Sequence, residues 1–279
     1  MAIELKNFLS KIDRDIEKMD LISARRKIAH LQTLVETDKW LDDDKIKKSA
    51  DLISFTKKNY QEIAWEFQKE LIKSIENSIR WEDPFLVRVT NQALPPRLYS
   101  HLTENFPMQK FLQPRKDAHF MRDNQFQRYE SVLTDIALKG AGHTTRKLWL
   151  GLRKAFEGKR LQEAICNAVG IKRPHTCQLD IRVMVDRCGF NMKPHTDGGN
   201  GAVLTYMMYF PPDGTMQEHG TEFFLKQGND FKMIRKRSLD ANSAHAFAIT
   251  QNSWHGLVTP IPEHAERRRS LVVRLLEVD

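Results

Sequence analysis

The stretch Lys193-Pro194-His195-Thr196-Asp197-Gly198-Gly199 places a histidine and an aspartate two residues apart. Side chains alternate between the two faces of an extended strand, so His195 and Asp197 project to the same side. One face can therefore offer an imidazole nitrogen and a carboxylate oxygen to a single metal ion. Alone, this pair is a weak signal, because a surface turn can carry both residues without binding anything.

A third ligand is needed, since two side chains hold a divalent metal poorly. The best-placed candidate is His255, which lies in the segment Ser253-Trp254-His255-Gly256. Two histidines and one carboxylate form the facial triad typical of non-heme Fe(II) oxygenases, which leaves coordination positions open for a cosubstrate and O₂. We therefore predict His195, Asp197 and His255 as metal ligands and catalytic residues.

Several other segments accompany the triad in a fixed order. They are the strand Leu204–Phe210, the turn Gly220-Thr221-Glu222-Phe223, and the pair Arg268-x-Ser270 at the start of the last apolar run. With the triad, these pieces resemble the Fe(II)/2-oxoglutarate-dependent dioxygenases, most closely their prolyl-hydroxylase-like branch. The resemblance covers about residues 84–279. It implies a double-stranded β-helix, a cupin-like jelly roll, with Fe(II), 2-oxoglutarate and O₂ as cofactor and cosubstrates.

The resemblance also assigns the residues that hold 2-oxoglutarate. Its far carboxylate needs a charged, forked partner, and a guanidinium supplies bidentate and permanently cationic recognition. Arg268 is the expected partner and counts as a catalytic residue, with Ser270 donating a hydroxyl hydrogen bond from the same face. Arg269 would point to the opposite face, although a bulge in the strand would exchange the two arginines.

Residues 178–186 alternate between polar and apolar side chains, which is typical of a strand with two different faces. If the apolar face packs under helices, the polar face lines the barrel, and Arg182 becomes a candidate for holding a carboxylate. The alternative is that Arg182 pairs with a neighbouring aspartate. Many relatives have a tyrosine nine residues before the first ligand histidine, whereas this chain has Asp186. Tyr206 is a further candidate cosubstrate contact.

The resemblance implies a hydroxylase acting on an unactivated C–H bond, with release of succinate and CO₂. Asp197 favours hydroxylation, because halogenating relatives have a small residue at that position. The expected substrate is amino-acid-like, peptidyl or another small polar molecule. Two alternatives remain open: a non-enzymatic cupin-like protein that binds a metal or small molecule, and an adaptor acting through N-terminal helices.

The first eighty residues have the periodicity of amphipathic helices. Apolar residues recur at three- and four-residue steps over residues 2–36 and again over residues 46–75, which predicts a helical hairpin. We expect region 1–82 to form this hairpin and region 83–279 to form the dioxygenase domain with supporting helices. The hairpin packs either on the barrel or on a second copy of itself, which would give a homodimer. Residues 111–131 read as an irregular loop that either helps to close the pocket or only covers the surface.

Composition limits the possible functions. The chain has 279 residues and a formal charge of +8, but lysine and arginine are interleaved with acidic residues, which is typical of a solvated helical face. We therefore expect no nucleic-acid partner. No apolar run is long enough to cross a bilayer, and the start lacks the pattern of a signal peptide, so we expect a cytoplasmic protein with no membrane partner. The three cysteines match no zinc spacing and fit a reducing compartment.

Overall fold

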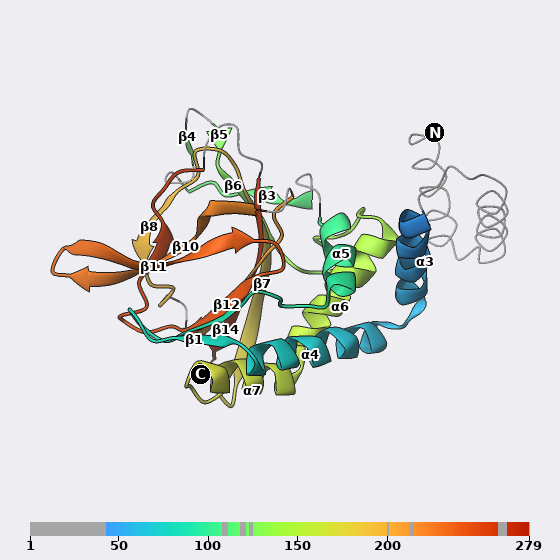
Figure 1. Cartoon of the computed structure of the whole chain (residues 1–279), viewed down its shortest axis with the longest axis horizontal. Coiled ribbons are helices and arrows are strands. Elements are labelled where there is room, and N and C mark those ends of the chain that lie inside the picture. The colour runs from blue at the N-terminus through green and yellow to red at the C-terminus, as the bar shows by residue number, and fades with distance from the viewer. Residues whose placement is uncertain are drawn as a thin grey trace.

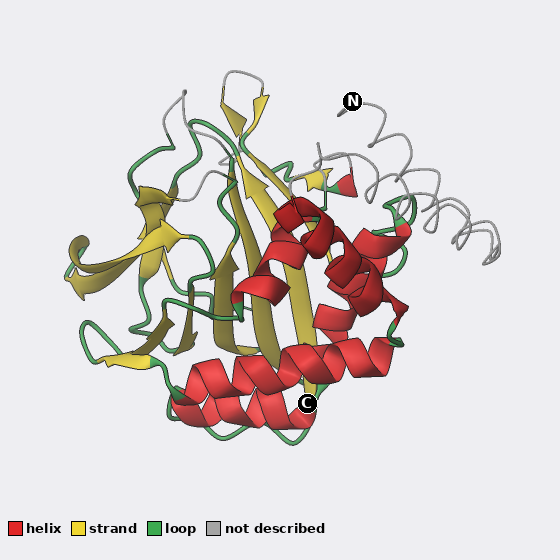
Figure 2. Cartoon of the chain, turned by 45° about the vertical axis from the view of Figure 1, so that its right-hand side comes forward, coloured by secondary structure: helices red, strands yellow, loops and turns green. Residues whose placement is uncertain are grey.

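The computed structural model describes residues 43–107, 111–117, 121–122, 125–199, 201–212, 215–261 and 267–278. Two antiparallel sheets face each other, and helices cover the outer face of the larger one (Figures 1 and 2). This confirms the predicted fold class, which is mainly β with helical additions in a jelly-roll layout. The N-terminal half of the predicted hairpin, residues 2–36, lies outside the described residues.

The larger sheet contains eight strands. In spatial order they are β1 (Ile79–Trp81), β2 (Val87–Thr90), β12 (Ala244–Ala248), β9 (Ala202–Tyr209), β14 (Arg268–Glu277), β7 (Cys177–Asp186), β6 (Arg128–Val132) and β3 (Gln113–Pro114). The smaller sheet contains β11 (Asp230–Asp240), β10 (Thr215–Gln227), β13 (His255–Leu257) and β8 (Met192–His195). A separate hairpin pairs β4 (Met121–Arg122) with β5 (Gln125–Phe126).

Strand β7 has the two faces that its sequence predicts. Ile181, Val183 and Val185 are buried in the main apolar cluster, together with residues of the helices. The alternate residues Met184 and Asp186 face the opposite way, toward the smaller sheet. Since β7 pairs with β14 along its whole length, the polar positions of the two strands form adjacent rows on the inner face of the barrel.

Five helices lie within the described residues. They are α3 (Asp43–Lys57), α4 (Tyr60–Glu76), α5 (Pro96–Glu104), α6 (His143–Glu157) and α7 (Lys159–Ala168). The single helix expected over residues 46–75 is divided into α3 and α4. Asn59 causes the break, because its side chain caps α4 in a capping box with Glu62. No described helix is long and apolar enough to span a membrane.

Helix α4 packs on the helices of the barrel. Its buried residues Ile63, Phe67 and Leu71 belong to the same apolar cluster as Leu148 of α6 and Val183 of β7. Figure 2 shows α4 running along the layer of helices beside the sheet. The apolar stripe of α4 is therefore covered by the chain's own barrel and its helices.

Part of the segment predicted as an irregular loop is a strand. Residues Arg128–Val132 form β6, which pairs in register with β7 and extends the larger sheet. The interpretation of residues 111–131 as wholly irregular is therefore wrong. The pairing matters for the site, because it turns Arg128 and Glu130 toward the inner face of the barrel.

We predict that Phe67→Ala destabilises the protein by about 3–5 kcal/mol, since Phe67 is fully buried and its removal leaves a cavity between α4 and the barrel. Trp65→Ala on the same helix is the matched control. Trp65 is 54% exposed, so its loss should change the free energy of unfolding by less than about 1 kcal/mol. Urea unfolding followed by circular dichroism measures both. Equal effects would mean that α4 does not pack on the barrel as described.

Candidate metal and cosubstrate site

The first and third predicted ligands lie on neighbouring strands. His195 ends β8 and stands directly opposite His255, the first residue of β13. The strands approach closely at Gly256, where a Cβ atom would lie only 2.6 Å from the carbonyl oxygen of Met192. A glycine at this position is therefore needed for the two histidines to meet.

The three predicted ligands converge. Asp197 Oδ1 lies 3.7 Å from His195 Nε2, and Asp197 Oδ2 lies 3.6 Å from His255 Nε2. One donor atom from each residue lies within 4.8 Å of the others, and the two imidazole rings are 4.4 Å apart between centroids. Residues 60 positions apart in sequence thus form one compact donor set.

Both histidines are oriented by backbone carbonyls. The Nδ1 atoms of His195 and His255 lie 2.9 Å and 3.0 Å from the carbonyl oxygens of Lys193 and Ser253. A carbonyl can only accept, so each Nδ1 carries the proton and donates it. Nε2 is then the nitrogen with the free lone pair, and it is the atom that faces Asp197.

The ionisation of two ligands suits metal binding. Burial raises the pKa of the Asp197 carboxyl, but His195, His255 and Arg274 together outweigh burial and hold this pKa well below its usual value. Burial, aided by the neighbouring His195, lowers the pKa of His255 to about 4. Asp197 is therefore an anion and His255 is neutral near pH 7, which are the forms that bind metals.

Two further side chains fix the carboxylate of Asp197. The hydroxyl of Thr205 donates to Oδ2 at 2.8 Å, and Arg274 Nη2 donates to Oδ1 at 3.0 Å. Each oxygen thus has a partner while still facing a histidine. Such supporting contacts orient metal ligands and are characteristic of built metal sites.

The donor set fits a divalent metal on chemical grounds. Two imidazole nitrogens and one carboxylate oxygen, all from one side, match the triad of non-heme Fe(II) sites. The supporting contacts from Thr205, Arg274 and the two carbonyls complete the arrangement. The residues could therefore hold Fe(II) and leave positions open on the side of the cavity.

The triad lines a narrow cavity of about 70 Å³ between the two sheets. Arg268 lines the same cavity, while Arg269 lies on the opposite face of β14, with its guanidinium over the ring of Phe106. The strand register is therefore the one that the sequence predicted. Ser270 faces inward like Arg268 and is fully buried, and its hydroxyl has no hydrogen-bond partner among the described residues.

Arg268 is already engaged by a carboxylate of the chain. Its Nη1 donates to Asp186 at 2.6 Å, and its Nε donates to the carbonyl oxygen of His219 at 3.0 Å. Arg128 binds the same carboxylate through two contacts, at 2.6 Å and 3.0 Å. Asp186 thus joins two guanidinium groups at the position where the family resemblance leads one to expect a tyrosine.

Of the four predicted cosubstrate contacts, Arg268 lines this cavity, whereas Ser270, Tyr206 and Arg182 are not among its lining residues. Tyr206 lies in the apolar cluster under the helices, 5.4 Å from the ring of Phe156, so its assignment as a cosubstrate contact is wrong. The neighbours of Tyr206 in sequence, Thr205 and Met207, are the residues of β9 that face the interior of the barrel. Arg182 does face inward, but it pairs with Asp180 and Glu130. The alternative interpretation of Arg182, pairing with a neighbouring aspartate, is the one that the structure supports.

Sequence reasoning missed three residues that shape the site. They are Arg128, Thr205 and Arg274. The signal for Arg274 was present, because it continues the two-residue spacing of Arg268 and Ser270 along the last strand. Arg128 gave no usable signal, since its segment was read as a loop.

No protein-family model matches the sequence, and no curated protein matches it. The fold is similar to solved structures. One is a prolyl hydroxylase from Trichoplax adhaerens in complex with a hypoxia-inducible-factor peptide fragment, at 12% identity and a TM-score of 0.48, covering 78% of this chain and 91% of that one.

A second is an oxidoreductase of the 2OG-Fe(II) oxygenase family from Burkholderia pseudomallei, at 10% identity and a TM-score of 0.45, with 75% and 89% of the two chains covered. A third is the epimerase SnoN in complex with Fe³⁺, alpha-ketoglutarate and nogalamycin RO, at 12% identity and a TM-score of 0.45, with 75% and 83% covered. At these identities the similarity concerns the fold alone.

We predict that His195→Ala, Asp197→Ala and His255→Ala each weaken Fe(II) binding by more than about a hundredfold, because losing a supporting contact alone costs about ten- to a hundredfold. Anaerobic calorimetric titration with Fe(II) measures this, and circular dichroism checks the fold. His175→Ala, at an exposed histidine, is the control and should bind metal as the parent does. Unchanged affinity in any of the three variants would remove that residue from the site.

We also predict that Thr205→Val and Arg274→Gln weaken Fe(II) binding about tenfold, because each frees one oxygen of Asp197 from its partner. Thr176→Val, at an exposed threonine, is the matched control. The same titration applies. Parent-like affinity in both variants would show that Asp197 is held by the histidines and metal alone.

Proposed function

We propose that the protein is an Fe(II)- and 2-oxoglutarate-dependent dioxygenase that hydroxylates an unactivated C–H bond. One observation carries the proposal: a His-Asp-His donor set and a buried arginine line the same cavity. A metal triad alone would suit many kinds of binding protein. A guanidinium inside the barrel adds the partner that a dicarboxylate cosubstrate requires.

His195, Asp197 and His255 would hold the iron. Bound Fe(II), with 2-oxoglutarate and O₂, would supply the oxidising chemistry that inserts oxygen into a C–H bond and releases succinate and CO₂. The chain's own contribution is position: the two carbonyls orient the histidines, and Thr205 and Arg274 orient the aspartate.

Arg268 is suited to the far carboxylate of the cosubstrate. Its Nη2 makes only long contacts, 3.5 Å to the hydroxyl of Tyr209 and 3.6 Å to the sulfur of Met207. Nη2 can therefore donate a hydrogen bond to a new partner while Nη1 stays on Asp186. The cavity is smaller than typical ligand pockets of about 300–1,000 Å³. We therefore expect side chains on its wall to move when 2-oxoglutarate enters.

The substrate we propose is a small polar molecule of the amino-acid or peptidyl kind. We place the enzyme in the cytoplasm, because its three free cysteines and its Fe(II) persist more readily in a reducing compartment.

The non-enzymatic binder would keep the metal site without consuming cosubstrate. An adaptor function through α4 is not supported, because the apolar stripe of this helix is buried against the barrel and is not exposed to a partner. A homodimer through the hairpin remains a prediction.

The decisive experiment is to follow 2-oxoglutarate consumption and succinate formation together. The purified chain is supplied with Fe(II), ascorbate and O₂ and is screened against free amino acids, peptidyl proline, sugars and nucleosides. Succinate should form in a one-to-one ratio with the 2-oxoglutarate consumed, and His255→Ala should form none. A protein that binds Fe(II) yet never converts 2-oxoglutarate, with any substrate, would support the non-enzymatic binder instead.

We predict that Arg268→Lys weakens 2-oxoglutarate binding about tenfold to a hundredfold, since a charge-assisted hydrogen bond contributes about 1.5–3 kcal/mol. Fe(II) binding should change much less. Arg269→Lys is the matched control, because the same substitution falls on the other face of β14. Anaerobic titration of the metal-loaded protein with 2-oxoglutarate measures both variants. A defect in Arg269→Lys with parent-like Arg268→Lys would contradict the assignment.

A further inference from the structure

The structure has a second and much larger cavity, which shares no lining residue with the triad cavity. It is a groove of about 650 Å³ at the β3 and β6 edge of the larger sheet, which is within the size range of small-molecule sites. Residues 111–116 form one wall and residues 132–139 form the other. Glu130 and Arg182 also line it, and they are its less exposed charged residues.

The groove is lined mainly by positive charge. Arg115, Lys116, Lys139 and Arg182 line it, and Glu130 is its acidic lining residue. Lys116 and Lys139 are exposed, and neither forms an ion pair within the described part of the chain. An anion entering the groove would therefore meet two lysines whose charges are not already matched by a neighbouring carboxylate.

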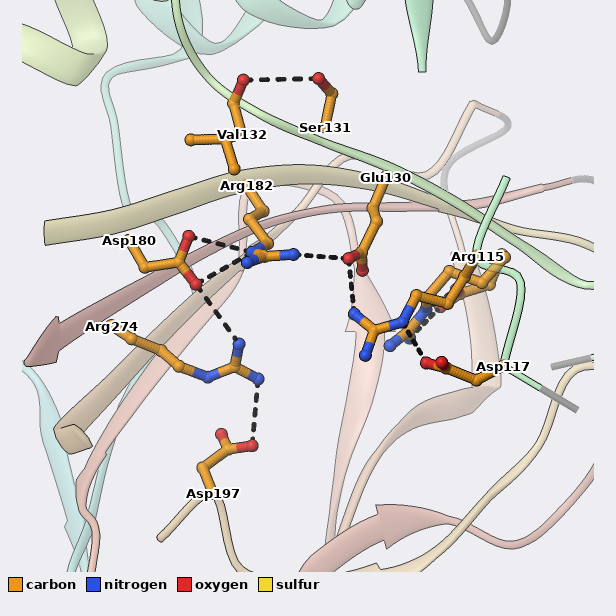
Figure 3. A network of polar contacts seen from close by, with 11 residues as sticks. Arg115, Asp117, Glu130, Ser131, Val132, Asp180, Arg182, Asp197 and Arg274 are labelled. Carbon is orange, nitrogen blue, oxygen red and sulfur yellow. Dashed lines mark hydrogen bonds and ion pairs between the residues drawn. The ribbon is translucent and has the colours of Figure 1, made fainter. Parts of the chain in front are cut away.

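Arg182 is held in place with part of its guanidinium still available. Its Nε lies 2.9 Å from both oxygens of Asp180, and its Nη1 donates to Glu130 at 2.6 Å. Arg115 donates to the same Glu130 oxygen at 2.7 Å, as Figure 3 shows. The third nitrogen of Arg182, Nη2, has no hydrogen-bond partner among the described residues, so it can bind an incoming anion.

The walls of the groove also offer apolar contact. Phe111 and Pro114 line one side, and Ile136 on the other side is 85% exposed. An isoleucine this exposed gains from being covered by an apolar ligand. The lining thus fits a molecule that combines an anionic group with an apolar part, rather than a bare inorganic anion.

A row of ion pairs connects this groove to the metal ligands. Arg182 binds Asp180, Asp180 lies 3.8 Å from Arg274 Nη1, and Arg274 donates to Asp197 at 3.0 Å. Figure 3 shows these four side chains following one another across the inner face of the barrel. The groove and the metal ligands are therefore joined by one row of ion pairs. We expect one end of a bound molecule to lie in the groove while the rest extends toward the triad.

We propose that this groove anchors the prime substrate through an organic anion, a carboxylate or phosphate attached to an apolar part, with Arg182 as the anchoring cation. Calling the bound molecule a substrate rests on the proposed function. Binding of an anion in the groove does not itself need iron or 2-oxoglutarate. Lys116 and Lys139 attract the anionic group, and Ile136 packs on the apolar part.

The first test uses metal-free protein and the probe 2-naphthoate, titrated by its fluorescence. Its neutral analogue 2-naphthamide and the ester 2-naphthyl phosphate are titrated in parallel. We expect 2-naphthoate or 2-naphthyl phosphate to bind at least tenfold more tightly than the amide, and the better of the two identifies the anionic group. Equal binding of all three probes would overturn the proposal.

Amino-acid substitutions in and outside the groove show where the probe binds. Arg182→Gln should weaken anion binding about tenfold or more, since it removes a charge-assisted contact. Because Arg182 also pairs with Asp180 and Glu130, the exposed variant Lys139→Glu provides a second test that leaves those pairs intact, with an expected loss of about threefold or more. Lys172→Glu, at an exposed lysine between α7 and β7, makes the same charge change and should have no effect. Anion binding that is lost in Arg268→Gln and kept in both groove variants would assign the probe to the cosubstrate cavity and refute the groove.

The second test uses the substrate found by the turnover screen. Lys139→Glu should raise the KM for that substrate about threefold to tenfold and leave kcat and the KM for 2-oxoglutarate within a factor of about two, because a rim charge affects binding rather than chemistry. A substrate without an anionic group, or a KM that does not respond, would overturn the assignment to the substrate. Anion binding with no turnover at all would instead count against the proposed function alone.

Discussion

The carboxylate of Asp197 is the charge around which the inner face of the barrel is arranged. It is largely removed from water, and an isolated buried carboxylate would be costly. Thr205, Arg274 and two histidines surround it, so both oxygens have partners. These partners keep the group ionised and fixed in direction. A metal would then meet a ligand that is already charged and oriented, and little reorganisation would be needed for binding.

The alternation of side chains along strands explains how so many charges reach one place. On β14, Arg268, Ser270, Val272 and Arg274 face inward, whereas Leu271, Val273 and Leu275 pack under the helices. On β7, Asp180 and Asp186 face inward next to them. Because the two strands pair in register, each inward aspartate has an arginine beside it. The strand pair β7–β14 thus carries Arg268 with its partner Asp186, the Arg274 that supports Asp197, and the Arg182 that lines the groove.

The sequence predicted those parts of the site that depend on local spacing. His195 and Asp197 are two residues apart, and Arg268 and Ser270 repeat that spacing, so the faces on which they lie follow from strand geometry. His255 required the family resemblance, because nothing local indicates which distant strand pairs with β8. Tyr206 was predicted as a cosubstrate contact, although strict alternation from the inward Thr205 turns it under the helices. Arg128 could not be predicted, since its position depends on the pairing of β6 with β7.

Arg268 and Arg182, the two arginines proposed to bind anions, are each fixed by a carboxylate of the chain itself. Arg268 is held by Asp186 at one end of the inner face, and Arg182 is held by Asp180 at the other. Both aspartates belong to β7. A long arginine side chain loses considerable rotamer entropy when it is fixed, and an internal carboxylate makes that loss part of folding rather than of binding.

In each case one nitrogen of the guanidinium, Nη2, is left with weak contacts or none. An incoming anion therefore meets an oriented donor, and it competes with the resident carboxylate only if it needs the rest of the guanidinium. Under the two proposals, the affinity for an anion at either end would depend on how readily the aspartate on β7 shares its arginine.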